Sequence, residues 1–158
     1  LVDTSSTTTD AVAEALQRAD RVVLVYDGRY AALSSLARMG SLAVRLGVAR
    51  TRIMRLENHA DPYMKADFAL GRAETGLEVA RPLRVFEGGQ EVARLLEEGL
   101  AGELSSYAGD FERSVASCLA QILVELGCLP ECDDARKAAR EPSVKRRIWP
   151  FSHTREAG

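Results

Sequence analysis

Apolar residues along this chain form short continuous runs, separated by longer stretches in which they recur at helical spacing. The run Arg21–Tyr26 is continuous and rich in β-branched residues, which is typical of a strand covered on both faces in a parallel sheet. Arg52–Glu57 and Pro82–Phe86 are predicted as two further strands, which lead into the turn-like segments Asn58–Pro62 and Glu87–Gly89. No tight hairpin turn joins these three runs, so a parallel arrangement is favoured.

Helical spacing occurs before, between and after the strands. Four helices are predicted: one capped by Thr9 or Asp10, one over Tyr30–Leu46 with Gly47 as its stop, one from about Val92 to Gly99, and the longest over Asp110–Leu126. A weaker pattern predicts a helix at Pro62–Leu70. Strands that alternate with such helices indicate right-handed βαβ units and a three-layer α/β domain with a mostly parallel sheet. The rhythm ends near Pro130, which divides the chain into a domain at 1–130 and a tail at 131–158.

Composition fits one globular domain. The chain has 158 residues, of which 46% are hydrophobic and 28% charged. A formal net charge of −2 gives no bulk attraction to nucleic acid, so no direct nucleic-acid binding is expected. Apolar runs are too short for a membrane span and there is no signal peptide, which predicts a cytoplasmic location. Three cysteines without a nearby histidine, Cys118, Cys128 and Cys132, indicate idle thiols rather than a zinc site or a disulfide framework.

Three polar segments follow the ends of predicted strands: Asp3–Thr9, Asn58–Asp61 and Phe86–Gln90. Ligands of open α/β sheets bind beyond the carboxyl ends of the strands, so these segments are expected to line one crevice. Asp3 suits a Mg²⁺ held through water, although a loop or capping aspartate has the same appearance. Asn58 offers a donor and an acceptor to a purine edge, and it would equally serve as a turn residue.

The order of these features resembles the second half of a MinD/ParA-type P-loop ATPase. The resemblance covers Leu1 to about Leu126: Val2-Asp3-Thr4, a helix, the strand Arg21–Tyr26, a helix, Ile53–Asn58, a late strand, a helix and a long last helix. Residues 16–47 are especially similar to that superfamily. The basic and aromatic segment Lys145–Phe151 after the long helix is most similar to the CpaE/TadZ branch, which is associated with Flp-type pilus assembly and with polar or septal positioning.

This resemblance implies roles for five residues. Asp3 would be the Walker B-type aspartate that positions Mg²⁺ through water, and Asn58 the asparagine that contacts adenine. Phe86, Glu87 and Gly88 would lie in the loop whose backbone packs against the base. The complete protein would bind ATP and Mg²⁺, form a homodimer, hydrolyse ATP slowly and act as a spatial switch. Its partners would be pilus, secretion, cell-pole or septum proteins, and chromosome or plasmid partition and division-site placement are the alternatives within the class.

The sequence departs from the family pattern at the phosphate end of the site. Asp3-Thr4-Ser5-Ser6 stands where many members have Asp-Thr-Pro-Pro, and no G-x-x-x-x-G-K-[ST] or Lys-Gly-Gly motif occurs in the chain. Without that motif, backbone amides and a lysine for the β- and γ-phosphates are lacking. We therefore expect a C-terminal part of such an ATPase, with a sheet incomplete at the N-terminus, an exposed apolar strand edge and no ATP hydrolysis by this chain alone. The alternative from another class is a non-catalytic adaptor without a P-loop.

Two other interpretations concern the site, and one concerns the tail. Asn58-His59-Ala60-Asp61 has the N-x-x-D spacing of guanine recognition, with His59 in place of the usual lysine. A receiver or flavodoxin-like module would use Asp3 but would need more acidic residues at neighbouring strand ends. From Asp133 onward seven Lys/Arg stand against four Asp/Glu, and the basic-aromatic segment 136–151 suits an anionic membrane surface, a protein partner or a solvated tail.

Overall fold

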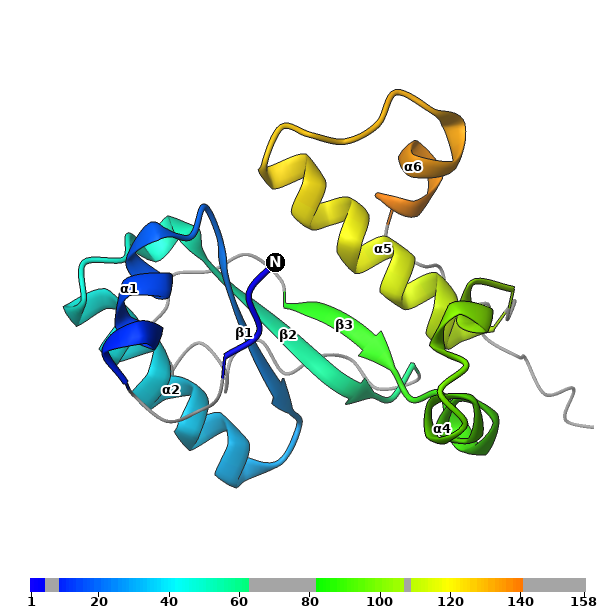
Figure 1. The fold of residues 1–158 in the computed structure, drawn as a ribbon, viewed down its shortest axis with the longest axis horizontal. Helices are drawn as coiled ribbons and strands as arrows, with labels where there is room; N and C mark the ends of the chain where they lie inside the picture. Colours follow the sequence, from blue (N-terminus) through cyan, green and yellow to red (C-terminus); the bar gives the residue numbers. More distant parts are fainter. Residues whose placement is uncertain (5–8, 63–81, 107–108, 141–158) are drawn as a thin grey trace, which may run out of the picture.

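The computed structural model describes residues 1–4, 9–62, 82–106 and 109–140. Within them, one parallel sheet has the order β1–β2–β3, and its strands are β1 (Val22–Asp27), β2 (Ile53–Ala60) and β3 (Leu83–Phe86). Figure 1 shows helices on both sides of this sheet. The expected α/β class is thus confirmed as a small parallel sheet flanked by helices.

Four of the described helices begin and end close to the predicted residues, and a fifth was not predicted. They are α1 (Asp10–Arg18), α2 (Tyr30–Arg45), α4 (Gly89–Glu97), α5 (Asp110–Glu125) and α6 (Asp133–Ala138), with 3-10 turns at Arg50–Arg52 and Ala101–Ser106. Thr9 caps α1, because its hydroxyl accepts a hydrogen bond from the Val12 N–H at 3.3 Å. Gly47 follows α2 with φ +93°, a conformation that favours glycine and ends the helix.

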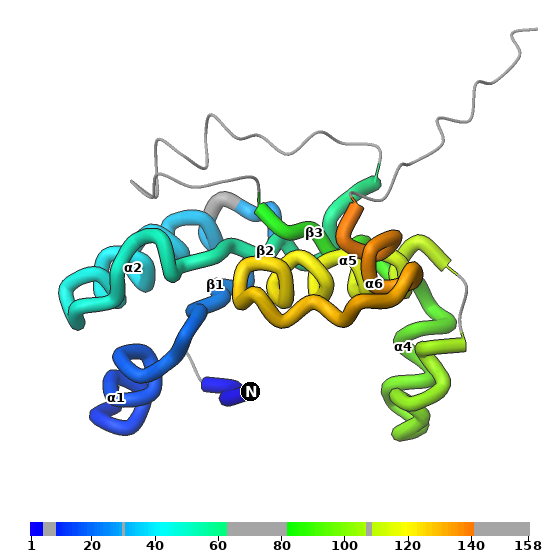
Figure 2. The backbone as a smooth tube through the Cα atoms, turned by 90° about the horizontal axis from the view of Figure 1, so that it is seen from above, coloured from blue at the N-terminus to red at the C-terminus, as the bar shows by residue number. Residues whose placement is uncertain are grey.

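Two apolar clusters lie on opposite sides of β2. The first joins α1, α2 and the starts of β1 and β2, and its buried members are Val12, Leu16, Val22, Ala43, Val48 and Ile53. The second joins β3 to α5 around Leu83, Val85 and Cys118, with Met54 and Leu56 of β2 packed against it. Ile53 and Met54 point to different clusters because successive strand side chains alternate between the faces of a sheet. Figure 2 shows α1 and α2 at one end of the sheet and α5 beside β2 and β3.

In the described part of the chain, β1 is an edge strand of the sheet. Among the described residues β1 pairs only with β2, and Val25 keeps 62% of its surface exposed. The strand end predicted at Leu1–Asp3 is not formed: residues 1–4 have no helix or strand, and Leu1 and Val2 are exposed. A strand needs a neighbouring backbone as its hydrogen-bond partner, and these residues do not pair with β1. The expectation of an exposed apolar strand edge is confirmed.

Only residues 131–140 of the predicted tail are among the described residues, and they include a helix. Helix α6 was not predicted, and it is joined to α5 because the Ser117 hydroxyl donates to the Arg140 carbonyl at 3.2 Å. The expected helix at Pro62–Leu70 lies almost wholly outside the described residues, as do residues 141–158 with most of the basic-aromatic segment. In the part of the chain that the structure describes, no helix is both long enough and apolar enough to cross a membrane.

Candidate functional site

The carboxyl ends of the three strands meet at one edge of the sheet. Asp27 at the end of β1 pairs with Asn58, and Ala60 at the end of β2 pairs with Phe86 at the end of β3. The sequence-predicted segments around Asn58 and Phe86 are therefore neighbours across the β2–β3 ladder. This edge is where parallel α/β sheets place their ligands.

The end of β2 differs from the prediction. Asn58 was expected in a turn, but β2 continues through Asn58 and His59 to Ala60. Glu57 pairs with Arg84 and Ala60 with Phe86, so three steps along β2 match two along β3, which is a β-bulge. His59 lies in this bulge with φ +55°, the left-handed region that non-glycine residues rarely adopt. The turn signal of Asn58–Pro62 therefore marks an irregularity within a strand, and Asn58 itself is half-buried.

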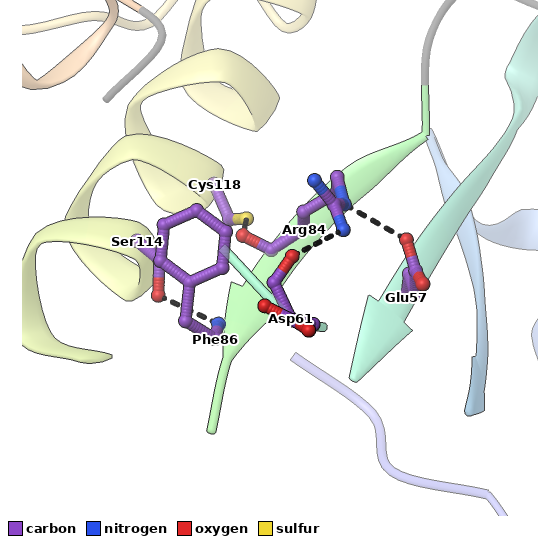
Figure 3. A network of polar contacts seen from close by, with 6 residues as sticks. All are labelled: Glu57, Asp61, Arg84, Phe86, Ser114 and Cys118. Atoms are coloured by element: carbon purple, nitrogen blue, oxygen red, sulfur yellow. Dashed lines mark hydrogen bonds and ion pairs between the residues drawn. The ribbon is translucent and has the colours of Figure 1, made fainter. Parts of the chain in front are cut away.

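Arg84 connects the two sides of this bulge. Its Nε donates to Glu57 Oε2 at 2.9 Å, and its Nη2 donates to the Asp61 carbonyl at 3.0 Å. Its guanidinium also lies over the Phe86 ring, 5.8 Å from the centroid. Figure 3 shows these groups together at the ends of β2 and β3. The Arg84 and Glu57 side chains are only 20% and 16% exposed, so this pair is shielded far more than a surface ion pair.

The end of β3 is fixed to α5 from the other face of the sheet. Ser114 is fully buried, and its hydroxyl accepts from the Phe86 N–H at 3.0 Å and donates to the Phe111 carbonyl at 2.7 Å. One turn further, the Cys118 thiol donates to the Arg84 carbonyl at 3.4 Å (Figure 3). Burial raises the pKa of the Cys118 thiol to about 11, which keeps it protonated as a donor.

The loop after β3 favours glycine at two successive positions, for two different reasons. Glu87 is exposed, and Gly88 is the N-cap of α4. A Cβ atom on Gly88 would lie 2.6 Å from the Val92 side chain, closer than atoms can approach without a shift. Gly89 follows with φ +67°, which also favours glycine. Because both positions favour glycine, the backbone at this edge of the sheet is not covered by side chains of these two residues. Contact of a planar base with the backbone would need such an arrangement.

Charged groups at the end of β1 are paired with each other. The Asp27 carboxylate accepts from Arg29 Nε at 2.6 Å and from the Arg29 N–H at 3.2 Å. The hydrogen bond from the Arg29 side chain holds the pKa of Asp27 below its ordinary value, and the nearby His59 acts in the same direction. The preceding residue of β1 is Tyr26, and the pKa of its hydroxyl is raised, chiefly by burial and also by the negative charge of Glu57. Asp27 therefore stays ionised and Tyr26 neutral near pH 7.

Asp3 is not brought to this edge as a strand end. It is exposed, in a segment with neither helix nor strand. In the described ranges there is no group of three or more His, Cys, Asp or Glu side chains that could hold a metal ion. Of the sequence-predicted site residues, Asn58 and Phe86 thus lie on neighbouring strands at the carboxyl edge, whereas Asp3 is exposed outside the sheet.

Two residues of the site were not identified from the sequence. Arg84 stands between Leu83 and Val85 in an otherwise apolar strand, and a charge in a buried run is a usable signal for a buried polar contact. Ser114 stands in the apolar stripe of α5 and carries a weaker signal, because a small hydroxyl residue is common on half-buried helix faces.

Comparison with protein-family models, with curated proteins and with solved structures found no match to this chain. The resemblance to MinD/ParA-type ATPases therefore rests on the sequence motifs alone.

Proposed function

We propose that this chain is the C-terminal part of a MinD/ParA-type ATPase that acts as a spatial positioning switch. The observation that carries the proposal is that Asn58, near the end of β2, and Phe86, at the end of β3, lie on neighbouring parallel strands at one carboxyl edge of the sheet. Two segments far apart in the sequence thereby offer an amide side chain and a glycine-lined backbone to one planar ligand. This arrangement supports a nucleotide site in which the chain binds the base.

The rest of the proposal concerns the complete protein. A segment before Leu1 would supply the phosphate-binding loop and the strand that covers the free edge of β1, where Val25 is exposed. ATP and Mg²⁺ would then drive homodimer formation, with Asp3 positioning the ion through water. The CpaE/TadZ-like tail favours pilus or secretion apparatus as the structure that is positioned, at a pole or septum in the cytoplasm. Adenine is favoured over guanine because His59 replaces the lysine of the guanine motif.

A non-catalytic adaptor is the second candidate. Its support is that two apolar side chains of α5, Leu119 and Val124, are 57% and 50% exposed and so are open to contact by a partner protein. An adaptor would have an initiation codon directly upstream of Leu1. An ATPase would have an in-frame glycine–lysine loop further upstream.

Nucleotide binding and turnover test the proposal in two steps. The 158-residue chain should show amide shifts at Asn58–Asp61 and Glu87–Gly89 in NMR titrations with millimolar ATP, and it should hydrolyse no ATP. The chain extended by its upstream segment should hydrolyse ATP slowly, and Asp3→Ala should abolish that turnover. Shifts scattered over the surface, or none, together with no turnover by the extended chain, would exclude the ATPase and leave the adaptor.

A further inference from the structure

The bulge in β2 interrupts the pairing of this strand with β3 near the carboxyl edge of the sheet. Between the Glu57–Arg84 and Ala60–Phe86 pairs the regular ladder is interrupted, and His59 adopts a strained backbone conformation there. Asn58 lies inside this interrupted stretch. Asn58 stays paired with Asp27 of β1, but its pairing with β3 does not by itself determine where it stands relative to the loop after Phe86.

The Arg84 side chain spans this interruption. It binds Glu57, the last β2 residue before the bulge, and the carbonyl of Asp61, the first residue after β2 ends. Leu83 and Val85 face α5, so Arg84 points to the other side of the sheet, where its guanidinium also covers the Phe86 ring. One planar group thus touches the chain before the bulge, the chain after it, and the last residue of the neighbouring strand.

Only arginine has the geometry for these three contacts. Its guanidinium carries donors in a rigid planar fork, so Nε and Nη2 reach two acceptors while the plane lies against an aromatic ring. Lysine would keep the positive charge beside Glu57, but its ammonium is a point donor that cannot make the other two contacts together. Arg84→Lys therefore separates the geometry of this clamp from its charge.

We propose that Arg84 is a positioning residue that sets the distance between Asn58 and the Phe86–Gly88 loop, and thereby the fit of a purine base between them. This inference rests on the proposed function, because it assumes that these two segments bind the base. Arg84 acts through Asn58 and Phe86 and does not itself contact the ligand.

The matched control is Arg94 of α4. Like Arg84 it is paired with carboxylates, at 2.8 Å to Glu91 and 2.7 Å to Glu98, but its side chain is 52% exposed and lies on the surface of a helix. Arg94→Lys should change neither the amides of the strand ends nor ligand binding. Any effect that Arg84→Lys shares with Arg94→Lys is a general effect of losing an arginine.

The experiment compares the 158-residue chain with Arg84→Lys, Arg94→Lys and Glu57→Gln by NMR, with ATP and GTP as probes. Unchanged core amides at Ile53 and Val85 report that a variant is folded. In the parent chain and in Arg94→Lys, ATP should shift the amides of Asn58–Asp61 and Glu87–Gly89 together. In Arg84→Lys the ATP affinity should fall by about tenfold or more and the preference for ATP over GTP should shrink, while exchange of the Ala60 and Asp61 amides speeds up.

Each outcome decides a separate question. If folded Arg84→Lys binds ATP within about twofold of the parent with unchanged selectivity, the positioning role is wrong and the proposed function stands. If the parent shows no ATP shifts at these segments, the proposed function fails and the inference fails with it. Should Arg84→Lys not fold, Glu57→Gln decides: it weakens one contact and leaves the Asp61 contact, so it should lower ATP affinity several-fold, and no loss would overturn the inference.

Discussion

Replacing Ser114 by alanine removes the hydrogen bond that the Phe86 N–H, at the end of β3, donates to a side chain of α5. The Phe86 N–H would lose its acceptor at 3.0 Å in a place where Ser114 is fully buried, so water has no access to replace it. An unsatisfied buried donor costs about 1–3 kcal/mol of the free energy of unfolding. The Phe111 carbonyl loses a donor as well, but it lies in the first turn of α5 and keeps the helix ladder.

Ser117→Ala is the matched control. Ser117 lies on the same helix and is also buried, yet its hydroxyl donates to the carbonyl of Arg140, an exposed residue whose carbonyl can turn to water. We expect Ser117→Ala to cost no more than about 1 kcal/mol. Urea unfolding followed by circular dichroism gives both values, and amide hydrogen exchange locates the change. Ser114→Ala should speed up exchange of the Phe86 amide specifically. Equal destabilisation by both variants, or unchanged Phe86 exchange, would refute the reasoning.

Three further predictions concern the thiols, the free edge and the end of β1. At pH 8, an Ellman assay should detect two fast thiols, Cys128 and Cys132, and one slow thiol, because Cys118 is buried with a pKa near 11; three equally fast thiols would contradict its burial. Val25→Lys should reduce aggregation of the chain in light scattering while changing the free energy of unfolding by less than about 0.5 kcal/mol. Leu96→Lys, an equally exposed apolar position on α4, is its control, and an equal benefit from both would show that the edge is not responsible. The pKa of Asp27 is depressed in the folded state, so its contribution to stability should be present above its ordinary pKa of 3.8 and be lost as pH falls through the folded value. Asp27→Asn should remove this part of the pH dependence of urea unfolding, and an unchanged acid limb would contradict the pairing with Arg29.

The regular elements were predictable because their signals are local. The continuous run at Arg21–Tyr26 corresponds to β1, and the apolar stripe of Asp110–Leu126 corresponds to α5. Thr9 begins α1 through its capping hydroxyl, and Gly47 ends α2 because it adopts a positive φ without strain. Each of these elements has a hydrophobic period within it or a capping residue beside it.

The errors arose where the deciding contact is not local. Asn58–Pro62 has the composition of a turn, but pairing with β3 extends β2 to Ala60 and places the irregularity at His59. Leu1–Asp3 has the composition of a strand end, but no neighbouring backbone pairs with it in the described residues. Helix α6 is short and polar, so it has no hydrophobic period by which it could be predicted. It is held by its contact with α5, which is not visible in the sequence.

The sequence by itself determined the class of the fold, a parallel sheet with helices between its strands, and it placed Asn58 and Phe86 near the ends of two of those strands. Hydrophobic period and turn chemistry are properties of neighbouring residues, and they are written directly in the order of amino acids. Only the tertiary structure decided that Arg84 bridges Glu57 and Asp61 and that Ser114 holds Phe86. These contacts join residues that lie 23 to 28 positions apart in the sequence, and their geometry exists only once the strands have paired and α5 has packed against them.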